Sequence, residues 1–302
     1  MSAPTDMIDL LLVTAIPHAL EERLRALFRL HRQANPEIRA IVGGGMSVVD
    51  AALIGALPKL EIIAIHGVGH DCIDMAAARR AGVRVTVTSG VLTDDVADLA
   101  IGLMLAVQRG IVANDRAVRD GGWRVPLGRR ANRRRIGLFG MGAIGRAIAA
   151  RAAPFAAEIL YTSRNAKADL PYRFVPRLTD LAAASDVLIL AASGGADTAG
   201  AVDATVLAAL GADGILINVA RGSIVDEPAL VFALQEKRIA GAGLDVFAHE
   251  PKVPAALASL DSVVLQPHQG SATVEARVAM ADLVIANLDA QFAGLPLPSP
   301  IA

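Results

Sequence analysis

The sequence predicts an α/β protein with two doubly wound parallel-sheet domains, and three observations lead to this prediction. The chain has 302 residues, more than one hydrophobic core usually holds, so two domains are expected and a single α/β barrel is the alternative. Two stretches alternate short apolar runs with helical patterns, as parallel sheets covered by helices do. Glycine-rich loops follow several apolar runs, at the strand ends where such sheets bind ligands.

The first alternating stretch occupies roughly the first 90 residues. Its strands are predicted at LLLVTA, IRAIVGG, EIIAIHG and VRVTVTSG, with helical patterns between them. The first helix is expected over residues 17–30, and His18 and His31, which flank it, are expected to face solvent. One apolar face of this helix would comprise Leu20, Leu24, Leu27 and Phe28.

The second alternating stretch begins at Ile136. A long helix over residues 96–118 leads into a linker rich in glycine and arginine, in which Arg133–Arg135 form a solvated approach to the next strand or, alternatively, a phosphate contact. Strands are then predicted at IGLF, EILY, DVLILAA, GILINVA, GAGLDVF and SVVLQP. A last long helix is expected over residues 273–292.

The composition argues against several classes of protein. With 29 basic and 30 acidic residues the net charge is −1, and aromatic residues are only 3%, so nucleic acid is not expected as a partner. The single cysteine, Cys72, excludes an internal disulfide, and no metal-ligand spacing occurs. Asp6 and Asp9 flank the first apolar run without a basic region, and no apolar run approaches roughly 18 residues. We expect a cytoplasmic protein with no membrane partner.

The residues Gly140–Gly145 form a G-x-G-x-x-G pattern between an apolar run and a helical pattern. Gly140 is expected to make the turn, Gly142 to admit a diphosphate, and Gly145 to let the helix pack on the strand. The backbone N–H groups and the positive helix end would then face the diphosphate of a dinucleotide. Short glycine patterns also arise by chance, so a tight turn without a ligand is the alternative.

Three later predicted strands lead to residues that could carry chemistry. GILINVA is followed by Arg221, GAGLDVF contains Asp245 and leads to Glu250, and SVVLQP leads to His268. Because the carboxyl ends of parallel strands share one edge, these side chains are expected beside the dinucleotide. Taken singly, each could instead be a surface or packing residue.

An arginine, a glutamate and a histidine at one sheet edge suit the reduction of a 2-keto acid. Negative charge develops on the carbonyl oxygen as hydride arrives, so a proton donor and a fixed cation are needed there. His268 can donate a proton near neutral pH, and Glu250 would orient the ring and favour its charged form. Arg221 offers a planar fork to the carboxylate and carbonyl of the substrate.

Five motifs, in order along the chain, resemble the D-2-hydroxyacid dehydrogenase family: TDDVADLAIGLMLA, GMGAIG, INVARGSIVDEPAL, GAGLDVFAHEP and QPHQGSATVEAR. The stretch GVGHDCIDMAAARRAGVRVTVTSGVLTDDVADLA is similar to the glyoxylate/hydroxypyruvate and hydroxyphenylpyruvate reductase branch. The resemblance implies a Rossmann cofactor domain over residues 99–269 inserted into a flavodoxin-like substrate-binding domain formed by residues 1–98 and 270–302.

The resemblance also implies roles for individual residues. Arg221, Glu250 and His268 would be catalytic, and the nicotinamide carboxamide would lie near Asp245. The substrate carboxylate would bind the backbone N–H groups of Val68 and Gly69, and His66 or His70 could line the pocket. The implied substrate-binding set is His66, Gly67, Val68 and Gly69. The implied cofactor-binding set is Thr93, Gly140, Met141, Gly142, Ala143, Ile144, Gly145, Ser163, Arg164, Val219, Ala220, Arg221, Asp245, His268 and Gly270.

The end of the strand EILY bears on the choice of nicotinamide cofactor. An NAD-selective site places an acid there to bind the ribose 2′-OH, but Thr162, Ser163 and Arg164 occupy this place, while Glu158 opens the strand and Asp169 lies several residues beyond. Hydroxyl groups and a guanidinium suit a 2′-phosphate, and NADP-dependent members of the family have a similar arginine. We predict NADPH, with weaker use of NADH; alternatively, Arg164 stacks on the adenine and both cofactors serve.

The leading function is an NADPH-dependent reductase of glyoxylate or hydroxypyruvate. Other D-2-hydroxy acids, including hydroxyphenyllactate, D-lactate and phosphoglycerate, are the first alternative, and a dinucleotide-sensing binding protein is the second. The loops 43–45 and 66–70 contain no arginine or lysine, which argues against a phosphorylated substrate. The family implies a homodimer, in which Trp123 either enters the partner's pocket or packs in the interface.

Overall fold

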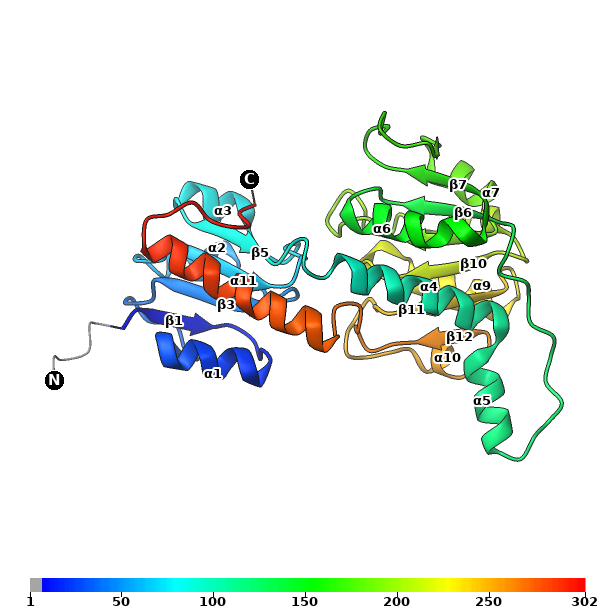
Figure 1. The fold of residues 1–302 in the computed structure, drawn as a ribbon, viewed down its shortest axis with the longest axis horizontal. Helices are drawn as coiled ribbons and strands as arrows, with labels where there is room; N and C mark the ends of the chain where they lie inside the picture. Colours follow the sequence, from blue (N-terminus) through cyan, green and yellow to red (C-terminus); the bar gives the residue numbers. More distant parts are fainter. Residues whose placement is uncertain (1–6, 302) are drawn as a thin grey trace. The chain divides into compact units, whose positions relative to one another are not determined.

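The computed structural model describes residues 7–301, so Asp6 lies outside the described residues. The chain divides into two compact units: the first comprises Met1–Leu92 and Val274–Ala302, and the second comprises Thr93–Thr273 (Figure 1). The second unit is therefore continuous in sequence and interrupts the first. The chain passes between the units a few residues from the expected boundaries at 98/99 and 269/270.

The first unit contains a parallel sheet of five strands in the order β2-β1-β3-β4-β5. This is the flavodoxin-like doubly wound order. Helices α1 and α11 cover one face of the sheet, and α2 and α3 cover the other. The strands are β1 (Asp9–Leu12), β2 (Arg29–His31), β3 (Ala40–Gly44), β4 (Ile62–His66) and β5 (Arg84–Val87), and the helices are α1 (His18–Leu27), α2 (Ala51–Gly55), α3 (Met75–Arg80) and α11 (Val274–Phe292).

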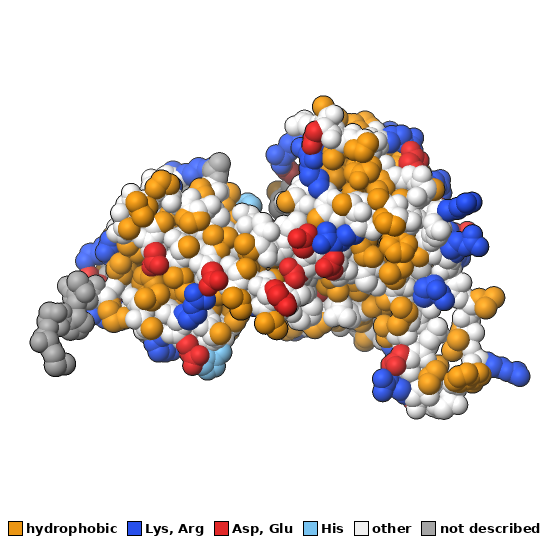
Figure 2. All heavy atoms as spheres, in the orientation of Figure 1, with side chains coloured by type: hydrophobic (Ala, Val, Ile, Leu, Met, Phe, Trp, Pro, Cys, Tyr) orange, Lys and Arg blue, Asp and Glu red, His pale blue; other side chains and the backbone are white. Residues whose placement is uncertain are grey.

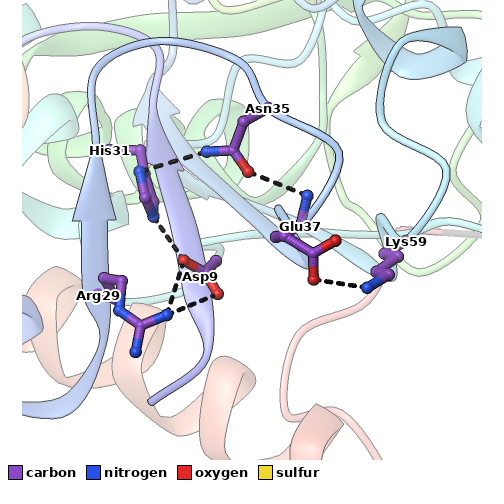
Figure 3. A network of polar contacts seen from close by, with 6 residues as sticks. All are labelled: Asp9, Arg29, His31, Asn35, Glu37 and Lys59. Carbon is purple, nitrogen blue, oxygen red and sulfur yellow. Dashed lines mark hydrogen bonds and ion pairs between the residues drawn. The ribbon is translucent and has the colours of Figure 1, made fainter. Parts of the chain in front are cut away.

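The expected first helix is too long, because its last residues form the edge strand β2. Asp9 on β1 accepts from His31 Nε2 at 2.6 Å and from Arg29 at 3.4 Å, and these contacts hold β2 against β1 (Figure 3). The network continues from His31 to Asn35, whose side chain accepts from the Glu37 N–H at 2.9 Å. The expectation that His31 faces solvent is therefore wrong. Leu27, expected on the apolar face, is 49% exposed because the helix ends there.

The second unit contains a parallel sheet of seven strands in the order β12-β11-β10-β9-β6-β7-β8. Chain order reverses between β6 and β9, which makes the end of β6 a topological switch point, the place where doubly wound sheets bind ligands. The predicted fold class is confirmed. The strands are β6 (Arg134–Phe139), β7 (Ala156–Thr162), β8 (Arg173–Phe174), β9 (Val187–Leu190), β10 (Ile215–Asn218), β11 (Gly241–Leu244) and β12 (Val263–Leu265).

Helices cover both faces of this sheet. Helices α7, α8 and α9 pack on one face, and α4 and α6 lie on the other. Glycine makes the close approach of α4 possible, because a Cβ at Gly243 would lie 3.0 Å from the Leu103 Cβ. The helices are α4 (Thr93–Arg109), α5 (Ile111–Arg119), α6 (Ala143–Ala152), α7 (Leu178–Ala183), α8 (Ala204–Leu210), α9 (Glu227–Gln235) and α10 (Ala255–Ala258).

The single helix expected over residues 96–118 is wrong, since α4 and α5 are separate. Gly110 adopts a left-handed conformation with φ of 60°, and the two helices meet at a bend of 60°. Glycine accepts this conformation without a steric cost, which permits the break. None of the helices within residues 7–301 is by itself long and apolar enough to cross a membrane, although α4 and α5 meet that test as a bent pair by length and composition.

Candidate active site

The three glycines after β6 have three different environments. Gly140 has φ of 103°, and a Cβ there would lie 2.5 Å from the Ala192 backbone nitrogen. Gly142 is the N-cap residue of α6, and its Cβ position is open. A Cβ at Gly145 would collide with the carbonyl oxygen of Gly140, so only glycine lets α6 lie this close to the turn.

The first turn of α6 follows this open position directly, because Gly142 is the N-cap residue of the helix. The first N–H groups of any helix lack intrahelical acceptors, and here they belong to a turn that leaves room for a ligand. Met141 is buried, whereas Ala143 is exposed and Ile144 is partly exposed. This is a cradle that fits a diphosphate by backbone contacts and helix polarity.

The end of β7 adjoins the glycine turn, because the Gly140 N–H donates to the Thr162 carbonyl at 2.9 Å. Ser163 Oγ donates to the Asn165 carbonyl at 2.7 Å and keeps its acceptor capacity. Arg164 is exposed, and within residues 7–301 its guanidinium has no ion pair or hydrogen bond. Asp169 is bound by Arg146 at 2.5 Å and 3.2 Å. Ser163 and Arg164 follow β7 directly, and the nearest carboxylate after them in sequence, Asp169, is bound to Arg146.

Arg221 follows β10 in a turn held by Asn218. The Asn218 side chain accepts from the Ala220 N–H at 3.0 Å and donates to the Arg221 carbonyl at 3.0 Å. The Arg221 guanidinium donates to the Ala220 carbonyl at 2.7 Å, and Val219 and Ala220 are buried. A Cβ at Gly222 would overlap the Phe247 carbonyl, so glycine is required there.

The sequence interpretation missed Asn218 and Gly222 as parts of the candidate site. Both lie within INVARG, the motif that carried the prediction of Arg221. A polar residue in an otherwise apolar strand was the available signal for Asn218, which is only 1% exposed. Such a buried amide normally has hydrogen-bond partners nearby.

Asp245 organises the loop that presents His268. Its side chain is 1% exposed, and its two carboxylate oxygens accept from the N–H groups of Gln269 at 2.6 Å and Gly270 at 2.8 Å. The Asp245 carbonyl accepts from the His268 N–H at 2.8 Å. Burial raises the pKa of the Asp245 carboxyl, and the two backbone hydrogen bonds oppose this shift. His268 is thereby held at φ of 56°, a conformation rare for a residue with a Cβ.

His268 and Glu250 form a hydrogen-bonded pair. His268 Nδ1 lies 2.8 Å from Glu250 Oε2, while Glu250 Oε1 accepts from the Phe247 N–H at 3.0 Å. Burial raises the pKa of Glu250, but the hydrogen bonds from His268 and Phe247 and the charges of His268 and Arg221 outweigh it, so the net pKa is lowered. The pair leaves Nε2 of the His268 ring as the nitrogen available to a substrate.

The three predicted catalytic residues thus come together at the carboxyl edge of the second sheet. The positive charge of Arg221 acts on Glu250, which in turn binds His268. Gly270 also fits here, because a Cβ would lie 3.1 Å from Asp245 Oδ2. Thr93 begins α4 and is partly exposed. No group of three or more His, Cys, Asp or Glu residues within positions 7–301 is arranged to hold a metal ion.

The loop after β4, in the first unit, carries the predicted substrate-binding residues. The Gly67 carbonyl accepts from the Thr88 N–H at 2.8 Å, whereas the N–H groups of Val68 and Gly69 make no hydrogen bond within residues 7–301. His66 is buried, and its Nε2 has no partner in that range. Burial, together with the charge of Arg277, lowers the pKa of His66 from 6.5 to about 4. Its ring is therefore neutral near pH 7.

Comparison with known proteins places this geometry in a family. The model for the NAD binding domain of the D-isomer specific 2-hydroxyacid dehydrogenases matches residues 101–270. The chain belongs to the D-2-hydroxyacid dehydrogenases. This family interconverts 2-keto and D-2-hydroxy acids, so the enzyme class and family predicted from the sequence are confirmed.

Close relatives of this D-2-hydroxyacid dehydrogenase match nearly its whole length. The 2-ketogluconate reductase of Gluconobacter oxydans is 47% identical and covers 97% of this chain and 98% of its own. The glyoxylate/hydroxypyruvate reductase A of Arabidopsis thaliana is 45% identical, covering 98% and 99%. The crystal structure of an NADPH-dependent glyoxylate/hydroxypyruvate reductase from Sinorhizobium meliloti, in complex with NADP and malonate, is 42% identical, covers 98% and 97%, and superposes with a TM-score of 0.94.

Proposed function

We propose that this dehydrogenase reduces glyoxylate or hydroxypyruvate with NADPH. The observation that carries the proposal is the His268–Glu250 pair, joined at 2.8 Å, at the sheet edge that also bears Arg221 and the glycine turn. The relatives named for these two substrates support the choice. The backbone cradle from Gly140 to Gly145 and the side chains of Ser163 and Arg164 would hold the cofactor, whose reduced nicotinamide supplies the hydride.

Each side chain has a defined task in this reaction. His268 Nε2 donates a proton to the substrate's carbonyl oxygen, where negative charge develops. Glu250, whose lowered pKa keeps it ionised, binds Nδ1 and fixes the orientation of the ring. Arg221 binds the carboxylate and polarises the carbonyl. We also propose that the N–H groups of Val68 and Gly69, which make no hydrogen bond within residues 7–301, bind a substrate carboxylate.

A panel of 2-keto acids assayed with NADPH and with NADH tests this function. Glyoxylate and hydroxypyruvate should give the highest kcat/KM with NADPH. The close relatives named 2-ketogluconate reductase and hydroxyphenylpyruvate reductase make those two acids the second candidates, so both belong in the panel. Turnover of none of these acids with either cofactor contradicts the proposal.

The Arg164→Ala variant tests the cofactor preference. A guanidinium bound to a 2′-phosphate is a charge-assisted interaction, so kcat/KM with NADPH should fall by roughly 10-fold or more while the NADH value changes little. Initial rates with each cofactor measure this. Arg84→Ala, at an exposed position in the first unit, is the control and should leave both values unchanged. Equal or better use of NADH by the wild-type enzyme, or no effect of Arg164→Ala, contradicts the preference.

We also infer that the enzyme is a cytoplasmic homodimer. Helix α5 has no buried residue, and hydrophobic side chains gather on it and on the segment that follows (Figure 2). Trp123 is 86% exposed and Leu127 is 98% exposed. A second copy of the chain would cover these side chains, because large apolar residues exposed close together in one segment are typical of a protein interface.

The Leu127→Asp variant tests the dimer. Light scattering coupled to size exclusion should give twice the chain mass of 31.2 kDa for the wild type and a shift toward monomer for the variant. Leu27→Asp, which changes a half-exposed leucine in the first unit, serves as the matched control and should stay dimeric. A monomeric wild type, or a variant that dimerises normally, contradicts the inference.

A further inference from the structure

The segment after β7 folds back onto helix α6. The Tyr161 hydroxyl accepts from the Lys167 N–H at 2.7 Å, and the Leu170 N–H donates to the Lys167 carbonyl at 3.3 Å. These contacts bring Asp169 to Arg146, in the first turn of α6. Both terminal nitrogens of the guanidinium donate to the carboxylate, at 2.5 Å and 3.2 Å.

This ion pair joins the two chain segments that flank the expected ribose of the cofactor. Arg146 belongs to the helix that begins at the glycine turn, and Asp169 belongs to the loop that begins with Ser163 and Arg164. The Gly140 N–H, which donates to the Thr162 carbonyl at 2.9 Å, ties the two segments together at their base. The pair therefore joins the start of α6 to the loop after β7. We expect a 2′-phosphate bound to Ser163 and Arg164 to lie between the same two segments.

Stability does not account for the pair. The side chains of Arg146 and Asp169 are 37% and 64% exposed, and exposed pairs of this kind contribute little to folding. The pair instead affects the local charge of the loop after β7. Asp169 is the only acidic residue between positions 163 and 177, a segment that also contains Arg164 and Lys167. The hydrogen bond from Arg146 lowers the pKa of Asp169, so the carboxylate is charged and bound.

We propose that Arg146 determines the preference for NADPH by engaging Asp169, and this inference rests on the proposed function. A free carboxylate at this position would do what the acid of an NAD-selective site does: it would accept a hydrogen bond from a ribose 2′-OH and repel a 2′-phosphate. Arg146 occupies one acceptor position on each oxygen of Asp169 and compensates its charge, so both effects are weakened. Arg146 is thus a positioning residue that acts through Asp169, and the cofactor's phosphate is left to Ser163 and Arg164.

The inference predicts a lower ratio in one single variant, no loss of the ratio in the other, and a cancellation in the double variant. Arg146→Ala frees Asp169, so the ratio of kcat/KM for NADPH over NADH should fall by roughly 10-fold or more, mainly through KM for the cofactor. Asp169→Asn should keep or raise the ratio. Arg146→Ala/Asp169→Asn should return it to within about 3-fold of the wild type, because the repelling charge is gone.

Four further measurements keep the test decisive. Arg146→Lys keeps one charged donor and should retain an intermediate ratio, and thermal unfolding of each variant shows that the comparison is made on folded protein. Dissociation constants of NADPH and NADH, measured by fluorescence titration, should follow the kinetic ratio. Arg151→Ala, on the same helix but paired with Asp94 and Asp98, is the matched control and should leave the ratio unchanged.

Two outcomes overturn the inference. Equal losses with NADPH and NADH in Arg146→Ala mean that the pair is only structural. A double variant that stays as poor with NADPH as Arg146→Ala means that Arg146 contacts the phosphate directly. Failure of the proposed function is separate: a wild-type enzyme without NADPH preference contradicts that proposal, whereas a wild type whose preference depends on Arg164 but not on Arg146 contradicts only this inference.

Discussion

The His268→Ala enzyme is expected to lose between roughly 100-fold and 10,000-fold in kcat for reduction of hydroxypyruvate, because no other group replaces the proton donor. Residues of the second unit hold both the side chain and the backbone of His268 in place. Glu250 binds its Nδ1 at 2.8 Å, and Asp245 holds its backbone at φ of 56° through three hydrogen bonds to residues 268–270. Steady-state rates with saturating NADPH measure the loss.

The same variant separates an enzyme from a dinucleotide-sensing protein. NADPH binding, followed by fluorescence titration, should stay within a few-fold of the wild type, since the glycine turn and Arg164 are untouched. His18→Ala, at a side chain that is 83% exposed, is the matched control and should keep full turnover. If His268→Ala turns over hydroxypyruvate at the wild-type rate, the proposed mechanism is wrong.

The glycine turn shows what local sequence can predict. Each glycine was assigned its own task, and the structure gives each the matching environment: positive φ at Gly140, open space at Gly142 and a backbone collision at Gly145 for any larger residue. The turn and the strand ends are set by residues close together in sequence and by the parallel sheet. The fold class could therefore be predicted in full, whereas the assignment of these glycines to a cofactor stays a prediction.

Tertiary contacts decide the features that the sequence did not reveal. Residues 29–31 fit a helical pattern, but parallel pairing with β1 and the contacts of Asp9 make them a strand. The helix expected over residues 96–118 has an uninterrupted apolar pattern, and the bend at Gly110 depends on a single left-handed residue. In the first place local periodicity competes with a contact made elsewhere in the fold, and in the second it competes with the backbone conformation of one glycine.

In the candidate site, too, some features follow from the sequence and others depend on contacts in the folded chain. Arg221, Glu250 and His268 could be placed at one edge because each follows a strand, but their supports lie in loops. The bond of Asn218 to the Arg221 carbonyl, the backbone bonds of Asp245 and the contact of Arg146 with Asp169 all depend on loop paths. Asp169 lies several residues beyond the end of β7 in sequence, and the fold of its loop gives it a partner, Arg146, that no spacing rule predicts.

Arg221→Ala is expected to lower kcat/KM for hydroxypyruvate by about 100-fold to 1,000-fold, the range found when one donor to a developing oxyanion is removed. The guanidinium is placed by a turn that tolerates little change, because Asn218 bonds to both sides of it and Gly222 leaves no room for a Cβ. Arg221→Lys keeps the charge but loses the planar fork, so it should recover only part of the rate.

A pH profile distinguishes this catalytic role of Arg221 from a structural one. The positive charge of Arg221 is one of the causes that lower the pKa of Glu250, so its removal should raise that pKa. Glu250 would then take up a proton at a higher pH and lose its ionic bond to His268, which moves the acid limb of the kcat/KM profile upward in pH. Arg238→Ala, which removes an exposed arginine stacked on Phe232, should move neither the rate nor the limb. An unshifted limb in Arg221→Ala, with loss of thermal stability alone, would show that Arg221 acts only on the fold.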